Sequence, residues 1–223
     1  MKFRLVYLAA AASSTVPAAQ SHLATRQKSS SNWAGAVHTT PSSVSFVTGT
    51  VTLPEYKRDP GLGASFWVGI DGATCRDAIL QTGVDYLNDS VYPWYEWYPA
   101  DARLYAQPLS AQPGDRIRMS VNATSATSGV ATLENLTTGE EARGEMKNQK
   151  RLCLRDANWI VELLPTKGLI DFGVVRFEAV EWHGGEGSKG ASAARVYDIE
   201  KAGRKSTKCS AGKDVVCEFS QHL

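Results

Sequence analysis

The chain has 223 residues, of which 43% are hydrophobic and 21% charged, with 19 glycines and 9 prolines. This composition excludes a disordered, collagen-like or coiled-coil protein and favours a globular one. Its 24 Lys and Arg residues nearly balance its 23 Asp and Glu residues. We therefore expect neither nucleic acid nor a membrane as a partner, because binding to either is typically driven by a strongly basic surface.

The N-terminus has the pattern of a secretory signal peptide. Lys2 and Arg4 precede an apolar run over residues 5–12, and small residues follow up to residue 19. The apolar run is too short to span a bilayer. We therefore expect residues 1–19 to be a signal peptide and the protein to be secreted; a disordered tail of a cytosolic protein is the alternative. Without Lys2 and Arg4, 22 basic residues face 23 acidic ones.

The segment that follows the signal is polar. Residues 20–31 contain Arg26 and Lys28 and no apolar pattern, so they are predicted to be a flexible leader or a short pro-segment. The remaining residues 32–223 suit one domain with a single core better than two domains.

This domain is predicted to be all-β. Short runs rich in Val, Ile, Thr and aromatic residues alternate with Gly, Pro, Asn and Asp, and no window shows a helical stripe. The expected strands span residues 33–38, 44–53, 64–70, 78–86, 92–98, 116–123, 131–135, 159–164, 174–182 and 194–199. So many strands imply two antiparallel sheets packed as a sandwich, or a closed barrel. The charged segment 139–155 is interpreted as a solvated hairpin or loop.

The four cysteines indicate disulfides. An even count suits a secreted protein, and the absence of paired C-x-x-C spacing argues against zinc or another metal. Three pairings are possible, of which Cys209 with Cys217 and Cys75 with Cys153 is the most economical. Three Asn-x-Ser/Thr sequons, at Asn88, Asn122 and Asn135, are typical of a glycoprotein if the host is eukaryotic.

Two neighbouring strands each carry polar groups on the face opposite the core. Strand alternation places Trp67 and Asp71 together in the first strand, and Gln81 and Asp85 together in the second. A glycine, Gly83 in the second strand, lies between the polar positions and leaves room for close approach. This arrangement predicts the floor of a cleft, although each residue taken alone could be an ordinary exposed or turn residue.

A carboxyl group and an aromatic run add to this pattern. Glu162 is the single ionisable group in the apolar run 159–163, so it lies either at a solvated edge or in a site that shifts its protonation. Residues 92–98 include five aromatic residues, among them Trp94, and also Glu96. One sheet face cannot bury them all, and we expect some to line a groove for an extended ligand.

Several motifs together resemble one family, the glutamic peptidases of the scytalidoglutamic and aspergilloglutamic type, or eqolisins. The motifs are NWAG (32–35), FWVGIDGATC (66–75), AILQTGVDY (78–86), WYEWYP (94–99) and NWIVE (158–162). They are ordered and spread over most of the chain. The resemblance implies a β-sandwich of the concanavalin A-like or jelly-roll-like kind, and a secreted, mostly fungal, acid endopeptidase that pepstatin does not block.

The resemblance also assigns residues. It implies that Gln81 and Glu162 form the catalytic pair and that Trp67, Asp71 and Asp85 line or support the site. It further implies a bridge between Cys75 and Cys153. Trp94 and Glu96 lie in the aromatic motif and are expected to contact substrate.

These side chains fit peptide hydrolysis without metal or cofactor. A carboxylate such as Glu162 can take a proton from water in mild acid and return it later. The Gln81 amide does not titrate and can donate to the oxyanion at any pH, a contribution of about 3 to 4 kcal/mol. We expect Asp71 and Asp85 to orient this amide and Trp67 to exclude water.

Two features depart from the family pattern. Leu163, Leu164 and Pro165 follow Glu162 where polar residues are expected, and they should raise the pKa of its carboxyl. With every carboxyl protonated, the 22 basic residues and 4 His would give about +26, so we expect an optimum in milder acid than is usual.

Two other functions fit the same architecture. One is a glycoside hydrolase with Glu96 and Glu162 as its carboxylate pair. The other is a lectin-like module without catalysis. Whichever function is correct, we expect the protein to be a monomer.

Overall fold

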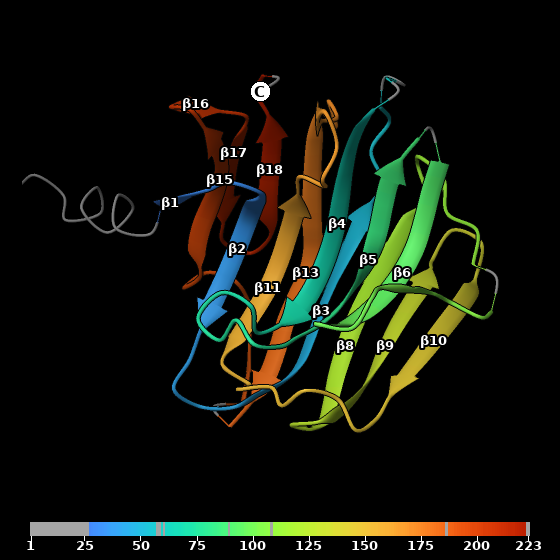
Figure 1. Cartoon of the computed structure of the whole chain (residues 1–223), viewed down its shortest axis with the longest axis vertical. Helices are drawn as coiled ribbons and strands as arrows, with labels where there is room; N and C mark the ends of the chain where they lie inside the picture. Colours follow the sequence, from blue (N-terminus) through green and yellow to red (C-terminus); the bar gives the residue numbers. More distant parts are fainter. Residues whose placement is uncertain are drawn as a thin grey trace, which may run out of the picture.

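A computed structural model describes residues 27–56, 59, 61–88, 90–107, 109–185 and 187–221. All regular secondary structure in these residues is β, and the strands form two sheets that pack face to face (Figure 1). The predicted sandwich is confirmed. None of the described residues forms a helix that could cross a lipid bilayer.

The larger sheet has ten strands in the order β1-β15-β2-β11-β4-β5-β6-β7, with β12 beside β4 and β16 beside β15. Its pairs are antiparallel except β1 with β15 and β12 with β4. The strands are β1 (Gln27–Ser30), β2 (Trp33–Thr39), β4 (Leu62–Ile70), β5 (Ile79–Leu87), β6 (Ser90–Tyr98), β7 (Arg103–Leu104), β11 (Asp156–Glu162), β12 (Gly168–Leu169), β15 (Arg195–Lys201) and β16 (Arg204–Lys205).

The smaller sheet has eight strands in the order β10-β9-β8-β3-β13-β18-β17, with β14 beside β13. They are β3 (Val44–Thr52), β8 (Arg116–Ser125), β9 (Ser128–Asn135), β10 (Glu140–Met146), β13 (Val174–Gly184), β14 (Gly187–Lys189), β17 (Thr207–Ala211) and β18 (Val215–Phe219). All ten predicted strands are present, with ends that differ by a few residues. The other strands, of which β10 is the longest, were not predicted as strands.

Strand β10 lies within the charged segment 139–155. It pairs with β9 as the second strand of a hairpin, which agrees with the hairpin interpretation. Ala142, Gly144 and Met146 are buried, whereas the charged residues between them are exposed. Alternation therefore holds here, but two of the three buried residues are an alanine and a glycine, so the sequence signal is weak.

The sequence predicts that the folded domain begins at residue 32. In the structure it begins earlier. Residues Gln27–Ser30 form β1, which pairs in parallel with β15. Gln27 Nε2 also donates to Asp198 Oδ2 at 2.6 Å. The end of the predicted leader is therefore a strand, because polar residues at a sheet edge can pair through their backbone. The predicted signal peptide and residues 20–26 lie outside the described residues.

The core fills the space between the sheets. Phe66, Trp159, Phe177 and Trp182 are among its largest fully buried side chains, and the Trp159 indole donates to the Thr48 carbonyl at 2.7 Å. A second, smaller apolar cluster lies on the opposite face of the larger sheet, and its buried members are Val37, Trp67, Trp94 and Ile160. The larger sheet therefore carries buried apolar residues on both faces. Packing against the smaller sheet explains the first face only, because the second face points away from that sheet.

The predicted disulfides are confirmed, Cys75 with Cys153 and Cys209 with Cys217. For one of the three sequons, the one at Asn135, the structure contradicts the prediction of a glycan. Asn135 is buried, and its Nδ2 donates to Ser110 O and Asp115 Oδ2, each at 2.9 Å. A glycan would replace one of the two N–H donors of this nitrogen and would need space beside a buried side chain, so the folded protein cannot carry one there. Asn88 and Asn122 are exposed.

Candidate active site

Strand register brings the two predicted catalytic residues to one face of the larger sheet. Glu162 of β11 pairs with Ser65 of β4, which pairs with Asp85 of β5. Gln81 lies four residues from Asp85 on the same strand, so its side chain points to the same face. Gln81 and Glu162, far apart in the chain, thus lie diagonally across β4.

The Trp67 indole lies between them. Its Nε1 donates to Glu162 Oε2 at 2.9 Å. At its other end, a Cβ added to Gly69 would lie 3.1 Å from Trp67 Cζ3 and 3.0 Å from Gln81 Cβ. A Cβ on Gly83 would lie 2.5 Å from Trp67 Cβ. The two glycines therefore leave space for the Trp67 side chain, which contacts Glu162 at its indole nitrogen and lies near Gln81 on its other side.

Gln81 and Glu162 line one groove of about 710 Å³, whereas Trp67 is fully buried and is not among the lining residues. Trp94, Glu96 and Asp85 of the neighbouring strands line it together with Gln81 and Glu162. Its walls come from residues 28–33 and from the loop between β4 and β5, including Gly72, Ala73 and Arg76; Tyr98, Ala102, Leu164 and Tyr197 also contribute. Part of the second apolar cluster, namely Trp94 with the partly buried Trp33, Ala73 and Tyr197, therefore lines this groove.

Glu162 is a half-buried carboxylate with several donors. Asn32 Nδ2 donates to its Oε1 at 2.8 Å, and Trp67 to its Oε2. Burial raises the pKa of Glu162, and the hydrogen-bond donors Trp33, Trp67 and Asn32 lower it again in part. The direction agrees with the prediction made from the apolar residues after Glu162. Asn32 was not predicted as a site residue, although the NWAG motif contains it.

Gln81 is held by Glu96. The two residues are directly paired across β5 and β6, and Gln81 Nε2 donates to Glu96 Oε2 in a short hydrogen bond. Gln81 is only 7% exposed, and no described residue donates to its Oε1. One N–H of the amide is thus fixed on a carboxyl group, which leaves the second N–H as the donor for a ligand.

The prediction that Asp71 orients the Gln81 amide is wrong. Its carboxylate accepts from the backbone N–H groups of Leu154 (2.7 Å), Arg155 (2.6 Å) and Asp156 (3.2 Å), and not from Gln81. Asp71 has a φ of 70°, so the chain leaves the strand alternation at this residue and its side chain turns toward the neighbouring loop. Through these hydrogen bonds, Asp71 joins the loop after β4 to the segment that precedes β11.

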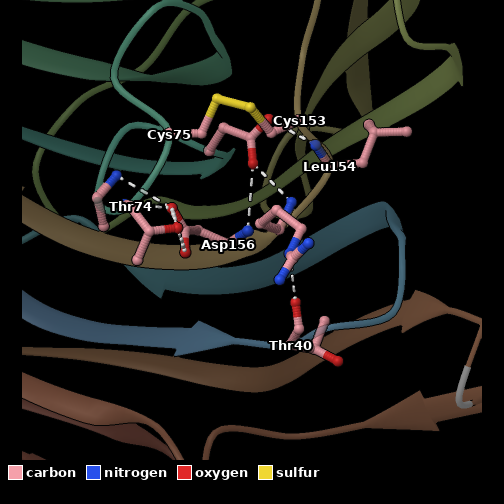
Figure 2. The surroundings of a disulfide bond; sticks show 9 residues. Thr40, Thr74, Cys75, Cys153, Leu154 and Asp156 are labelled. Carbon is pink, nitrogen blue, oxygen red and sulfur yellow. Dashed lines mark hydrogen bonds between the residues drawn. A yellow bond between two sulfur atoms is a disulfide. The ribbon is translucent and has the colours of Figure 1, made fainter.

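A reciprocal contact completes this junction. Asp156 accepts from the backbone N–H of Thr74 at 2.7 Å and from its hydroxyl at 2.8 Å. Figure 2 shows these groups beside the Cys75–Cys153 disulfide. The loop that forms one wall of the groove is therefore fastened by two carboxylates and a covalent bond. Sequence reasoning missed Asp156 because nothing local distinguishes it from an exposed residue at a strand start.

Asp85 and Glu96 are unusual carboxyl groups. Burial raises the pKa of Asp85 to about 6, although the nearby Ser65 hydroxyl and Trp94 indole lower it in part without forming bonds of normal geometry. Burial also raises the pKa of Glu96, against the opposing effect of the Gln81 hydrogen bond. Asp85 makes no hydrogen bond to Gln81, so its predicted orienting role belongs instead to Glu96.

Among the described residues, no three His, Cys, Asp or Glu side chains gather in a way that could hold a metal ion. The groove offers carboxyl groups, one amide and indole rings. These groups can bind a polar backbone, donate to an oxygen atom and transfer a proton.

Comparison with known proteins agrees with this arrangement. Residues 31–219 match the pattern of the peptidase A4 family. The chain belongs to this family. It is therefore a glutamic endopeptidase, which confirms the resemblance and favours it over the glycoside hydrolase and the lectin-like module.

Two relatives support the assignment. The chain is 38% identical to aspergillopepsin-2 of Aspergillus niger over 222 residues, which cover 86% of this chain and 78% of the relative. It is 44% identical to scytalidopepsin B of Scytalidium lignicola over 135 residues, 59% of this chain and 51% of the relative.

Solved structures of peptidase A4 members have the same fold. Scytalido-glutamic peptidase with a peptide-based transition state analogue superposes with a TM-score of 0.78 at 34% identity, covering 85% of this chain and 98% of the other. Aspergilloglutamic peptidase from Aspergillus niger gives 0.66 at 41% identity, covering 71% and 99%.

Proposed function

We propose that this peptidase is a secreted, pepstatin-insensitive acid endopeptidase in which Glu162 is the general base and Gln81 stabilises the oxyanion. The observation that carries the proposal is that both side chains line one groove, on one sheet face, with the Trp67 ring between them. A groove of this volume holds several residues of an extended polypeptide.

The chemistry starts at Glu162. Its carboxylate accepts a proton from a water molecule, and the water oxygen attacks the scissile carbonyl carbon. The carbonyl oxygen becomes an oxyanion and accepts a hydrogen bond from the second N–H of the Gln81 amide. The Glu162 carboxylic acid then gives its proton to the leaving amine, the C–N bond breaks, and the carboxylate is restored.

Glu96 prepares Gln81 for this step. An amide that rotates by 180° would present its oxygen, which repels an oxyanion, instead of its nitrogen. The Glu96 carboxyl accepts one N–H of Gln81 and so favours the productive orientation. Glu96 is a positioning residue in this scheme, and Trp67 positions Glu162 in the same way.

Acid activity follows from the groove's carboxyl groups. Burial raises the pKa of Glu162, Asp85 and Glu96, so in mild acid Asp85 is largely neutral and repels the Glu162 carboxylate less. In stronger acid Glu162 is protonated and cannot act as a base. We expect activity to fall on the acid side as Glu162 gains its proton.

Polypeptides are the proposed substrates. Solved relatives bind a peptide-based transition state analogue and, in another case, the tripeptide Ala-Ile-His. Secretion is proposed because the N-terminal sequence has a signal pattern and the structure contains two disulfides. A monomer is the proposed state.

The test is proteolysis of denatured casein by the secreted protein across acid pH, with pepstatin and with a chelator. We expect cleavage to continue in both, and to fall by at least about a hundredfold in Glu162→Gln and in Gln81→Ala. Circular dichroism checks that both variants fold. Cleavage of β-glucan instead of casein, or full activity in either folded variant, would contradict the proposal.

A further inference from the structure

Arg76 extends the groove beyond its catalytic residues. It lies in the loop between β4 and β5, is exposed, and lines the groove on the wall that also includes Gly72 and Ala73. The basic residues of the lining are Arg76 and, from β1, Lys28. The acidic ones, Asp85, Glu96 and Glu162, come from the strands.

The backbone that carries Arg76 is held in place. The preceding residue, Cys75, is bonded to Cys153, and the Cys75 carbonyl accepts the Gly72 N–H at 2.7 Å. Thr74 is fastened to Asp156 on the same side (Figure 2). A side chain on such a base loses less freedom when it binds a ligand than one on a mobile loop, because the backbone is already ordered.

The Arg76 guanidinium is available for a ligand. Within the described part of the chain it forms no ion pair or hydrogen bond, not even with the adjacent Asp77, whereas Arg118 pairs with Glu134 and Arg176 with Asp214. On the other side of the disulfide, Arg155 donates its Nε to the Thr40 carbonyl. Arg76 is thus an unpaired, planar donor at the edge of a substrate groove.

The groove repels anions less in mild acid than at neutral pH. Near pH 5, Asp85 with its pKa raised to about 6 is mostly neutral, so one of the three carboxyl groups of the lining carries little negative charge. Arg76 keeps its charge at any working pH, and a glutamate in a peptide, with a pKa of about 4.3, is largely ionised at pH 5. A guanidinium can bind such a carboxylate through two parallel hydrogen bonds.

We propose that Arg76 is a specificity residue that binds a carboxylate of the polypeptide substrate, so that one subsite on this wall prefers an acidic residue. The inference rests on the proposed function and adds the substrate class to it. A carboxylate can come from an Asp or Glu side chain or from the C-terminus of a short peptide, and the two sources need separate tests.

The experiment uses fluorogenic peptides with blocked ends, in which Glu, Gln or Lys is moved through each position on both sides of the cleaved bond. At pH 5 we expect one position at which Glu gives a kcat/KM about fivefold above Gln. Arg76→Gln should remove this ratio, and Arg76→Glu should reverse it toward Lys. A second peptide set with a free C-terminal carboxylate and no acidic side chain tests the other source.

The matched control is Arg195→Gln, because Arg195 is an exposed arginine of β15 that does not line the groove. It should leave the ratio unchanged. The inference is overturned if no position prefers Glu and no free C-terminus improves cleavage, or if the preference survives Arg76→Gln. It is also overturned if Lys28→Gln, and not Arg76→Gln, removes the preference. Casein cleavage by the unaltered enzyme separates these outcomes from a failure of the proposed function itself.

Discussion

The Trp67 indole N–H is bonded to Glu162 Oε2 at 2.9 Å, although 95 residues separate the two in the chain. The two positions lie on adjacent strands, β4 and β11, which pair through Ser65 and Glu162. Trp67, which is fully buried, thus stabilises the ionised form of the proposed base through this hydrogen bond.

Trp67→Phe keeps an aromatic ring and removes this donor. A carboxylate that loses a hydrogen bond is harder to ionise, so the pKa of Glu162 should rise. The acidic limb of the pH profile of kcat/KM should then move to higher pH, with activity at pH 4 reduced about tenfold. Trp97→Phe is the control, because it removes an indole N–H that donates to the Lys150 carbonyl, away from Glu162. An unmoved limb in Trp67→Phe would contradict this role.

Glu96→Ala should release the Gln81 amide. Without its acceptor the amide can rotate, and a fraction of molecules would present oxygen to the developing oxyanion. We expect kcat to fall about tenfold with little change in KM, because the contact matters most in the transition state. Steady-state kinetics on one peptide measures both. A rise in KM alone would show that Glu96 binds substrate instead of positioning Gln81.

Asp71→Asn should destabilise the groove wall. The carboxylate accepts three backbone N–H groups, and an amide can accept them only through one oxygen. Bonds to a charged group contribute about 1.5 to 3 kcal/mol, so the free energy of unfolding should fall by about 2 kcal/mol. Urea unfolding measures it. Asp77→Asn, in the exposed part of the same loop, should change stability by less than about 0.5 kcal/mol.

Ionisation of the buried Asp85 carboxyl should lower the free energy of unfolding as pH rises. Its folded pKa is about 6 against an ordinary value of 3.8, so between pH 4 and 6 the folded state holds the proton more tightly than the unfolded state. The stability due to this proton is complete below about pH 4 and is lost as pH rises through 6. Asp85→Asn should therefore gain about 1 to 3 kcal/mol at pH 7 and little at pH 4. Equal effects at both pH values would rule this out.

Strong acid should act in the opposite direction. When all carboxyls are protonated, the 22 Lys and Arg residues outside the predicted signal and the 4 His leave a large positive charge, whose self-repulsion favours the unfolded state. The melting temperature should therefore pass through a maximum in mild acid and fall below about pH 3. Added salt should reduce that fall by screening. A melting temperature that keeps rising down to pH 2 would be the contrary result.

Much of this could be predicted from the sequence alone, because strand alternation is a local property. The period of two in β4 and β5 placed Phe66 in the core and Trp67 opposite to it, and it placed Gln81 on the same face as Asp85. The motif resemblance identified the family, because the order and spacing of the motifs can be read from the linear sequence without knowledge of any contact.

Only the tertiary structure decided which polar groups touch. Gln81 bonds to Glu96 because the β5–β6 register places them opposite each other, and register depends on the whole hairpin. Asp71 turns away from Gln81 because its backbone leaves the strand at a positive φ and finds free N–H groups after Cys153. Contacts between distant segments follow from how the sheets pack, and a linear pattern of residue types does not contain that information.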